Sequence, residues 1–384
     1  MKLRLTLILS LVAFSSACSN TQEHTRDTLQ SAPSIPTVTQ KTYDLNGLIM
    51  RNSLIDQISD KRAIIIGEVH DRLEHHQNQL RIIKGLYERN PDLVIGVEYL
   101  QQPFQRYLDD YIAGRIDERE MLIKAEYFKR WQVDFRVIQP IFAFARENHI
   151  PILALNIADE IHNKVFKSGI ASLGPEDMAQ IPADIQPASQ HYLQRLKRIF
   201  DSHPVGKSFE NFVEGVLLWD ESMADTATRY LQSNPKSQIV VLSGLVHVLF
   251  GDGIPERIDR RLGSKQTAIL INGVDFDDFP DAADFQLVTQ GSVELPKSGR
   301  LGISIMDGGG TIRVTEFTTD SAAQATGIQI GDRIVSLDGV NVGNIPELKS
   351  LMFDREPGEL IQVGVQRNAK SKANKTLQFD VVLR

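Results

Sequence analysis

A carboxylate and an imidazole lie two residues apart at the end of an apolar segment. Residues 63–70 read Ala-Ile-Ile-Ile-Gly-Glu-Val-His, and three consecutive isoleucines are typical of a strand buried on both faces of a parallel sheet. Gly67 ends the apolar run, and Glu68 and His70 follow it. Such a pair can share a metal ion, a water molecule or a proton. The motif has little specificity alone, so its meaning depends on what other strands bring to the same edge.

Three further apolar segments precede polar residues: Leu93–Glu98, Pro151–Asn156 and Ile239–Leu242, the last followed by Ser-Gly-Leu-Val-His247. Helical patterns separate the segments, which predicts an α/β fold with a parallel sheet and right-handed crossovers. Ligands bind beyond the carboxyl ends of the strands in such sheets. One edge is therefore expected to present Glu68, His70, Glu98, Asn156 and His247. A mixed Glu/His set suits a divalent cation such as Zn, Mn, Co or Fe, or an acid–base pair.

Other polar residues have two open interpretations each. His76 lies on the apolar stripe of a helix predicted over residues 72–90, as a ligand or as a hydrogen-bonded core histidine, whereas His75 is expected at the surface. Glu98 either binds a cation or forms a structural salt bridge. A long helix predicted over residues 206–233 carries Trp219-Asp220-Glu221. Its two acids are expected on the helix surface, with contact to the site as the alternative.

The segments around this helix are less informative. Residues 168–204 are interpreted as surface elaboration, with an irregular or helical lid as the alternative. Gln266–Ile271 is expected to be the last strand of the first domain. A basic helix before it carries three arginines that either hold a carboxylate or only add surface charge: Arg257, Arg260 and Arg261.

Length and charge limit the function classes. A chain of 384 residues is longer than one compact core usually allows, so two domains are expected. The formal net charge is -7, which argues against nucleic acid as a partner.

Residues 1–18 have the pattern of an export signal. Lys2 and Arg4 precede an apolar run that is too short for a permanent membrane span. Ser-Ser-Ala before Cys18 resembles a bacterial lipobox, which implies cleavage before this cysteine and its modification with lipid, including palmitate. Ser19 fits sorting to the outer membrane, facing the periplasm or the cell surface. The alternative is a simple secreted protein with an incidental cysteine.

Residues 19–42 are rich in Ser, Thr, Gln and Pro and are expected to form a flexible tether without structure.

Several segments together resemble the ChaN-like haem-binding lipoproteins, which share a superfamily with the Tiki proteases and erythromycin esterases. They are Ile66–Asp71, Gly96–Glu98, Trp131 with Gln139–Ile141, Ile152–Asn156, Leu218–Ala224 and Gly244–His247. The resemblance covers residues 43–275 and implies an α/β domain that acts in haem or iron uptake at the outer membrane. The functional set of the hydrolytic relatives carries over to Glu68, His70, Glu98 and His247.

Haem in a non-covalent site is usually held by His, Tyr, Met or Cys. Cys18 is assigned to the lipid, and the chain has no Cys-x-x-Cys-His motif. Candidate haem-binding residues are therefore His70, His76, His247 and Tyr99. Tyr107 and Tyr127 lie nearby in sequence, and each tyrosine has packing as its alternative role. Haem bound at the interface of a homodimer is also compatible with the sequence.

The C-terminal sequence resembles a bacterial PDZ domain. Residues 276–292 are interpreted as an acidic linker, and the resemblance covers residues 293–384. It rests on Gly299–Ile303, Asp320–Ala323, Ala325–Ile328, Gly331–Ile334 and Leu337–Gly339. PDZ domains are mainly β and take an extended peptide, often a C-terminus, as an added strand. The resemblance implies a carboxylate-binding loop at Leu301, Gly302 and Ile303, with Ile303, Ile305 and Leu348 lining the groove; packing against the first domain is the alternative.

Three functional hypotheses follow. The leading one is a lipid-anchored haem-binding protein for haem or iron uptake, whose PDZ module recruits a partner; this is a binding protein rather than an enzyme. The second is a metal-dependent hydrolase, a Tiki-like peptidase or esterase. In it, Glu68, His70, Glu98 and His247 hold a divalent cation that lowers the pKa of water, with Glu68 as ligand or general base. The third, a PDZ adaptor with an inert first domain, ranks last because an inert domain does not need acids on buried strand ends.

Overall fold

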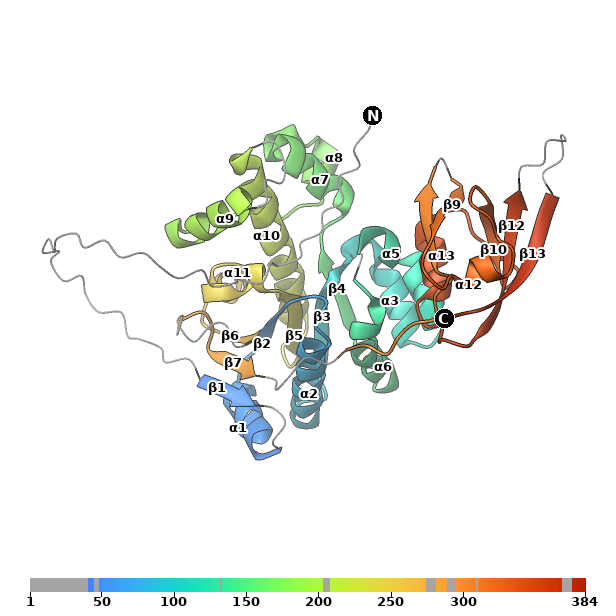
Figure 1. Cartoon of the computed structure of the whole chain (residues 1–384). Helices are drawn as coiled ribbons and strands as arrows, with labels where there is room; N and C mark the ends of the chain where they lie inside the picture. Colours follow the sequence, from blue (N-terminus) through green and yellow to red (C-terminus); the bar gives the residue numbers. More distant parts are fainter. Residues whose placement is uncertain are drawn as a thin grey trace, which may run out of the picture. The chain divides into compact units, whose positions relative to one another are not determined.

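The computed structural model describes residues 41–44, 48–131, 133–202, 208–273, 281–288, 294–308, 310–367 and 375–384. The chain divides into two compact units, and Figure 1 shows their elements coloured along the sequence. The first unit contains residues 1–70, 81–91 and 162–290; the second contains residues 71–80, 92–161 and 291–384. The predicted signal peptide, Cys18 and most of the predicted tether lie outside the described residues.

A parallel sheet forms the centre of the first unit. Its strands, in spatial order, are β1 (Lys41–Asp44), β7 (Phe285–Val288), β6 (Thr267–Asn272), β2 (Ala63–Glu68) and β5 (Gln238–Gly244). The three isoleucines of β2 are fully buried, as expected for a strand covered on both faces. The predicted α/β class is confirmed.

The register between β2 and β5 decides which side chains meet at the sheet edge. Gly67 pairs with Ser243 and Glu68 pairs with Gly244, so both strands end at the same level. The residues that follow them, His70 and His247, therefore leave the sheet from neighbouring strand ends.

The helices of the first unit vary greatly in length. They are α1 (Leu48–Ile58), η3 (Ile170–Ser172), α8 (Pro175–Met178), α9 (Gln190–Ser202), α10 (Phe209–Ser233), η4 (Leu245–His247), η5 (Leu249–Gly251) and α11 (Ile254–Leu262). Two more, α2 (Leu73–Arg89) and α7 (Asp159–Ser168), have residues in both units. The longest, α10, begins where the Ser208 side chain accepts a hydrogen bond from the backbone N–H of Asn211. Along the described chain, no helix is long and apolar enough to cross a membrane.

The second unit combines a parallel strand pair with the PDZ domain. β3 (Leu93–Gln101) pairs with β4 (Ile152–Asn156). The elements between them are η1 (Gln102–Phe104), α3 (Gln105–Ile112), α4 (Glu118–Lys124), α5 (Tyr127–Arg130), η2 (Phe135–Val137) and α6 (Gln139–Glu147).

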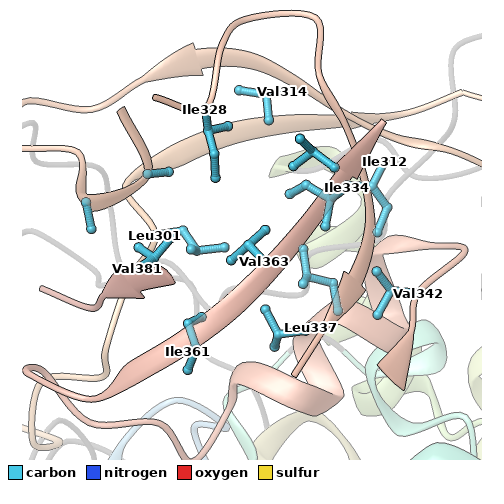
Figure 2. Close-up of a cluster of buried hydrophobic side chains, with 14 of the residues drawn as sticks. Leu301, Ile312, Val314, Ile328, Ile334, Leu337, Val342, Ile361, Val363 and Val381 are labelled. Carbon is cyan, nitrogen blue, oxygen red and sulfur yellow. The ribbon is translucent and has the colours of Figure 1, made fainter. Parts of the chain in front are cut away.

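The PDZ domain is an antiparallel sheet with two short helices. The strands are β8 (Ile303–Asp307), β9 (Ile312–Phe317), β10 (Arg333–Leu337), β11 (Val340–Asn341), β12 (Leu360–Arg367) and β13 (Lys375–Val382). The spatial order is β13-β12-β10-β9-β8, so β8 lies at an edge. The helices are α12 (Ala322–Ala325) and α13 (Ile345–Met352). Figure 2 shows aliphatic side chains from β9, β10, β12 and β13 filling the core. The predicted small, mainly β domain is confirmed.

Two expectations about the domain borders are wrong. β1 starts at Lys41, so the last two residues of the predicted tether belong to the sheet. β7 lies inside the predicted linker, and Gln266–Ile271 is therefore not the last strand. The run of aspartates before β7 suggested an exposed linker. Asp284 in this run is instead structural, because its carboxylate accepts a hydrogen bond from the backbone N–H of Ile269.

Candidate functional site

Glu68 and His70 form a hydrogen-bonded pair at the end of β2. Glu68 is fully buried, and its Oε1 lies 2.9 Å from Nδ1 of the partly exposed His70. An ionised carboxylate can only accept a hydrogen bond, so Nδ1 carries the proton and donates it. The other ring nitrogen, Nε2, is then the one that can bind a metal or accept a proton.

His247 forms a second pair of the same kind after β5. Its Nδ1 lies 2.7 Å from Oδ1 of Asp220 on α10, and both side chains are buried. The hydroxyl of Tyr192 on α9 donates to Oδ2 of the same carboxylate at 2.7 Å. Burial, and then the Asp220 charge, raise the pKa of Tyr192 well above its usual value, so Tyr192 remains a donor. Asp220 therefore receives two hydrogen bonds and fixes the His247 ring.

The backbone after His247 is tightly packed and strained. Phe250 has a positive φ of 62°, which is uncommon for a bulky residue. A Cβ at Gly253 would lie 2.2 Å from the carbonyl oxygen of His247, so a side chain there would displace the histidine. The buried Arg257 donates to the carbonyls of Asp252 and Gly253 at 2.7 and 3.1 Å. These contacts hold the loop that starts at His247.

A third histidine, His162 on α7, lies near His247. Its ring stacks on Trp219 with the centroids 3.7 Å apart, and the edge of Trp219 faces His247 at 5.7 Å. Burial lowers the pKa of His162 to about 3, so the ring is neutral at physiological pH. Among the described residues its Nε2 has no hydrogen-bond partner. This histidine was not identified from the sequence, because a single His in a short helical pattern has no distinguishing spacing.

The acids of α10 are buried, contrary to the expectation of a helix surface. Glu221 is fully buried and pairs with Arg257 at 3.1 Å, with Arg260 at 3.0 Å and with Arg261. These arginines therefore hold a protein carboxylate, and Arg257 is not surface charge. A buried carboxylate without such partners would be strongly destabilising.

The segment 168–204 contributes to the site through Tyr192, so surface elaboration is not its only role. Part of it also forms a pocket of about 570 Å³ beside α10. The lining is mainly apolar: Ile170, Met178, Ile181, Pro182, Ala183, Ile185, Gln186, Pro187, Glu214 and Leu217. The backbone N–H of Gln186 donates to Glu221 at 2.9 Å, which ties this wall to the helix that carries Asp220.

The second unit holds the remaining candidates. His76 is buried, and its Nδ1 lies 2.9 Å from Oε1 of Gln79, as the core interpretation predicts. Its ring contacts Tyr99 edge-on at 6.3 Å, and Tyr99 contacts Trp131 at 5.6 Å. Glu98 is also buried. His75 is buried as well, so its expected surface position is wrong; the helix α2 is covered on more than its apolar stripe.

Within the described ranges, no three His, Cys, Asp or Glu side chains form a group that could hold a metal ion. The metal set of Glu68, His70, Glu98 and His247 stays a prediction. What the geometry does provide is two carboxylate-paired histidines at neighbouring strand ends. Each pair can orient Nε2 for iron coordination or for proton transfer.

The loop before β8 is tightly packed, and its predicted carboxylate-binding role stays a prediction. Gly302 has a positive φ of 69°, and a Cβ there would lie 2.7 Å from Cα of Ser321. The carbonyl of Leu301 accepts hydrogen bonds from the Ala323 backbone at 2.9 Å and the Ser321 hydroxyl at 3.2 Å. Ile303, Ile305 and Leu348 pack against the domain core beside this loop.

Comparison with known proteins finds two family matches along the chain. The sequence matches the model of a family described as haem-binding uptake, Tiki superfamily, ChaN over residues 54–258, which is more than half of the chain. It matches the PDZ domain over residues 299–381. No curated protein sequence matches the chain.

Three solved structures illustrate the similarity. The structure of cofacial heme binding to ChaN of Campylobacter jejuni is 17% identical, with a TM-score of 0.50 over 62% of this chain and 91% of that one. The type III effector HopBA1 is 12% identical, with a TM-score of 0.39 over 66% and 97% of the two chains. The HtrA-type protease AlgW with decapeptide is 22% identical, with a TM-score of 0.20 over 23% and 30%. Of these, the first shows a shared fold.

Proposed function

The chain belongs to the haem-binding uptake, Tiki superfamily, ChaN family, and on this premise we propose that its first domain binds haem through carboxylate-paired histidines. The observation that carries this proposal is the pair of contacts His70–Glu68 and His247–Asp220 at neighbouring strand ends. Histidines that bind metals usually donate their other ring N–H to a carboxylate or carbonyl, which orients the ring and raises the basicity of the ligand. The residues present therefore fit haem.

His247 is the residue that would hold the haem iron in this proposal. Haem supplies an iron that accepts a histidine nitrogen. Asp220 accepts the Nδ1 proton of His247, Tyr192 holds Asp220, and Gly253 lets the loop pack closely against the histidine backbone. His70 is the second candidate ligand, because its Nδ1 is engaged by Glu68 in the same way. The apolar pocket beside α10 offers a wall of the type that binds apolar ligands.

We also propose the cellular context. Cys18 anchors the mature chain by lipid to the outer membrane, the first domain acts in haem or iron uptake, and the PDZ domain binds the C-terminal segment of a partner at β8. This edge strand and the Gly302 loop support peptide addition.

A haemin titration tests the haem proposal. The chain from Ser19 onward, purified after removal of divalent metals with a chelator, should bind haemin saturably at a simple ratio and shift its Soret absorbance. Absence of saturable binding would overturn the proposal.

Metal-dependent hydrolysis remains the alternative function, because a carboxylate-paired histidine can also act as a general base. The Glu68–His70 pair is the relevant observation, since His70 is partly exposed. This alternative predicts a stoichiometric divalent metal in the purified protein and its loss in His70→Ala. Metal analysis by mass spectrometry distinguishes it from haem binding.

A further inference from the structure

Helix α13 of the PDZ domain packs against two different parts of the second unit. Leu348 and Leu351 on one side of α13 are buried in the PDZ core, where Ile303 and Ile305 of β8 also pack. The helix also packs against α4 and α5. The helix α13 therefore contacts both the PDZ core and residues outside the PDZ domain.

The contact between α13 and the helices is specific. Phe353, which directly follows α13, is buried with its ring 5.8 Å from Phe128 on α5 and 6.0 Å from Phe135. Arg119 on α4 donates to both carboxylate oxygens of Asp354 at 2.7 and 2.8 Å. Both hydrogen bonds come from the same guanidinium nitrogen, Nη2. An aromatic contact beside a charged hydrogen bond defines the position of this contact better than apolar packing alone.

From this contact, aromatic rings continue toward the candidate haem-binding residues. Phe128 and Tyr127 are adjacent in α5, and their rings are in contact. Trp131 directly follows this helix, and its backbone N–H donates to the carbonyl of Tyr127 at 2.7 Å. The Trp131 ring lies 5.6 Å from Tyr99, and Tyr99 lies 6.3 Å from His76.

The element in the middle of this path is short and strained. α5 has one turn, from Tyr127 to Arg130, and Glu126 before it has a positive φ of 52°. The Glu126 carboxylate pairs with Lys129 at 2.8 Å and with Arg130 at 2.8 Å, which holds this conformation. Strained short elements are suited to switching between two arrangements.

We propose that the Phe353 contact is a regulatory contact, through which peptide binding beside β8 changes the positions of Trp131 and Tyr99. Phe353 is a positioning residue: it touches α5, and α5 sets the packing of Trp131 on Tyr99. The haem-dependent part of this inference rests on the proposed haem binding and on Tyr99, which the sequence offers as a further haem-binding candidate. The structural side, from Phe353 to Trp131, does not depend on haem.

Fluorine NMR tests the structural side directly. The chain has two tryptophans, Trp131 and Trp219, so labelling with 5-fluorotryptophan gives two resonances, and Trp219 in the first unit is the internal reference. In Phe353→Ala, the Trp131 resonance should shift by more than its line width while the Trp219 resonance stays. Leu360→Ala, an exposed apolar position on β12, is the matched control and should move neither resonance.

The ion pair provides a test that leaves the buried core intact. Arg119→Asp should shift the Trp131 resonance in the same direction as Phe353→Ala. The double exchange Arg119→Asp with Asp354→Arg should restore it. An unmoved Trp131 resonance in both single variants, or an equal shift in Leu360→Ala, would overturn the proposal.

A haemin titration of the same proteins separates this inference from the proposed function. Phe353→Ala should change the haemin dissociation constant by about threefold or more, as expected for coupling between sites. If the unsubstituted chain binds no haemin, the haem proposal fails, whereas the Trp131 resonance still decides whether the contact controls Tyr99. Haemin binding with identical affinity in Phe353→Ala and the unsubstituted chain would overturn the regulatory role.

Discussion

At the scale of single residues, two carboxylates determine where protons reside at the sheet edge. Glu68 and Asp220 are fully buried and each accepts a hydrogen bond from Nδ1 of a histidine. Tyr192 adds a second hydrogen bond to Asp220 only. His247 is therefore more rigidly held than His70, which favours His247 as the iron ligand.

Asp220→Asn should weaken haemin binding by about tenfold or more, because removing the partner of a metal-binding histidine changes both its orientation and its basicity. The dissociation constant from a Soret titration measures the effect. Asp225→Asn is a matched control on the same helix, since Asp225 lies five residues further along and is partly exposed, pairing with Arg229. Equal affinities in the two variants would argue against the role assigned to Asp220.

His162 should make the fold sensitive to acid. Its pKa is about 3 in the folded protein and about 6.5 in the unfolded chain, so between these values only the unfolded chain binds the proton. The free energy of unfolding therefore falls as the pH falls through this window, by about 1.4 kcal/mol per pH unit from this group.

His162→Phe keeps an aromatic ring against Trp219 and removes this proton. Between about pH 6.5 and pH 4.5, the free energy of unfolding of His162→Phe should fall by about 2 kcal/mol less than that of the unsubstituted chain. Urea unfolding at both pH values measures the difference. Parallel pH profiles for the two proteins would show that His162 is not buried as a neutral ring.

At the scale of secondary-structure elements, the loop from η4 to α11 holds His247 by close packing. Gly253→Ala should destabilise the fold by about 1–3 kcal/mol, because the new Cβ would overlap the His247 carbonyl. It should also weaken haemin binding. Gly174→Ala is the control, since a Cβ there meets no atom within 4 Å and its φ is ordinary. Thermal unfolding and a haemin titration of both variants check this, and unchanged values for Gly253→Ala would contradict it.

The strands of this sheet edge could be predicted from the sequence, because β-branched runs such as Ile64–Ile66 have a clear pattern. Glu68, His70 and His247 followed from their places after these runs. The structure confirms the fold and brings Glu68 and His70 together, and it places His247 at the neighbouring strand end.

The partners of His247 could not be predicted, because the relevant signals are tertiary. Asp220 and Glu221 belong to a 25-residue helix that is buried nearly all round between Gly215 and Ala224. A polar pair on a long helix normally indicates a solvent-facing side. Three closely spaced arginines on α11 were the available signal that a buried carboxylate needed partners. Tyr192 had none, since it lies in a segment without clear periodicity.

At the scale of the whole molecule, the lipid anchor is the proposal that decides where the chain acts. Cys18→Ser should release the mature chain from the membrane fraction and abolish incorporation of labelled palmitate. Ser19→Asp is the paired variant. It should retain the lipid but no longer be found in the outer-membrane fraction. Cell fractionation measures both. Membrane retention of Cys18→Ser without lipid would contradict the anchor.

The two domains also differ in what they contribute. The first domain supplies the carboxylate-paired histidines at a sheet edge. The PDZ domain supplies an edge strand and the Phe353 contact. Their association in one chain is consistent with haem binding that responds to a partner. Such a response requires that haem binds in the first place.

The most direct test of the central claim is therefore the visible spectrum of the haemin complex in His247→Ala and in a control. His191→Ala is the control because His191 is an exposed histidine that pairs with Asp252. If His247 holds the iron, His247→Ala loses the histidine-ligated spectrum and binds haemin at least about tenfold more weakly, whereas His191→Ala retains both. An unchanged spectrum and affinity in His247→Ala would show that the carboxylate-paired His247 does not hold the iron.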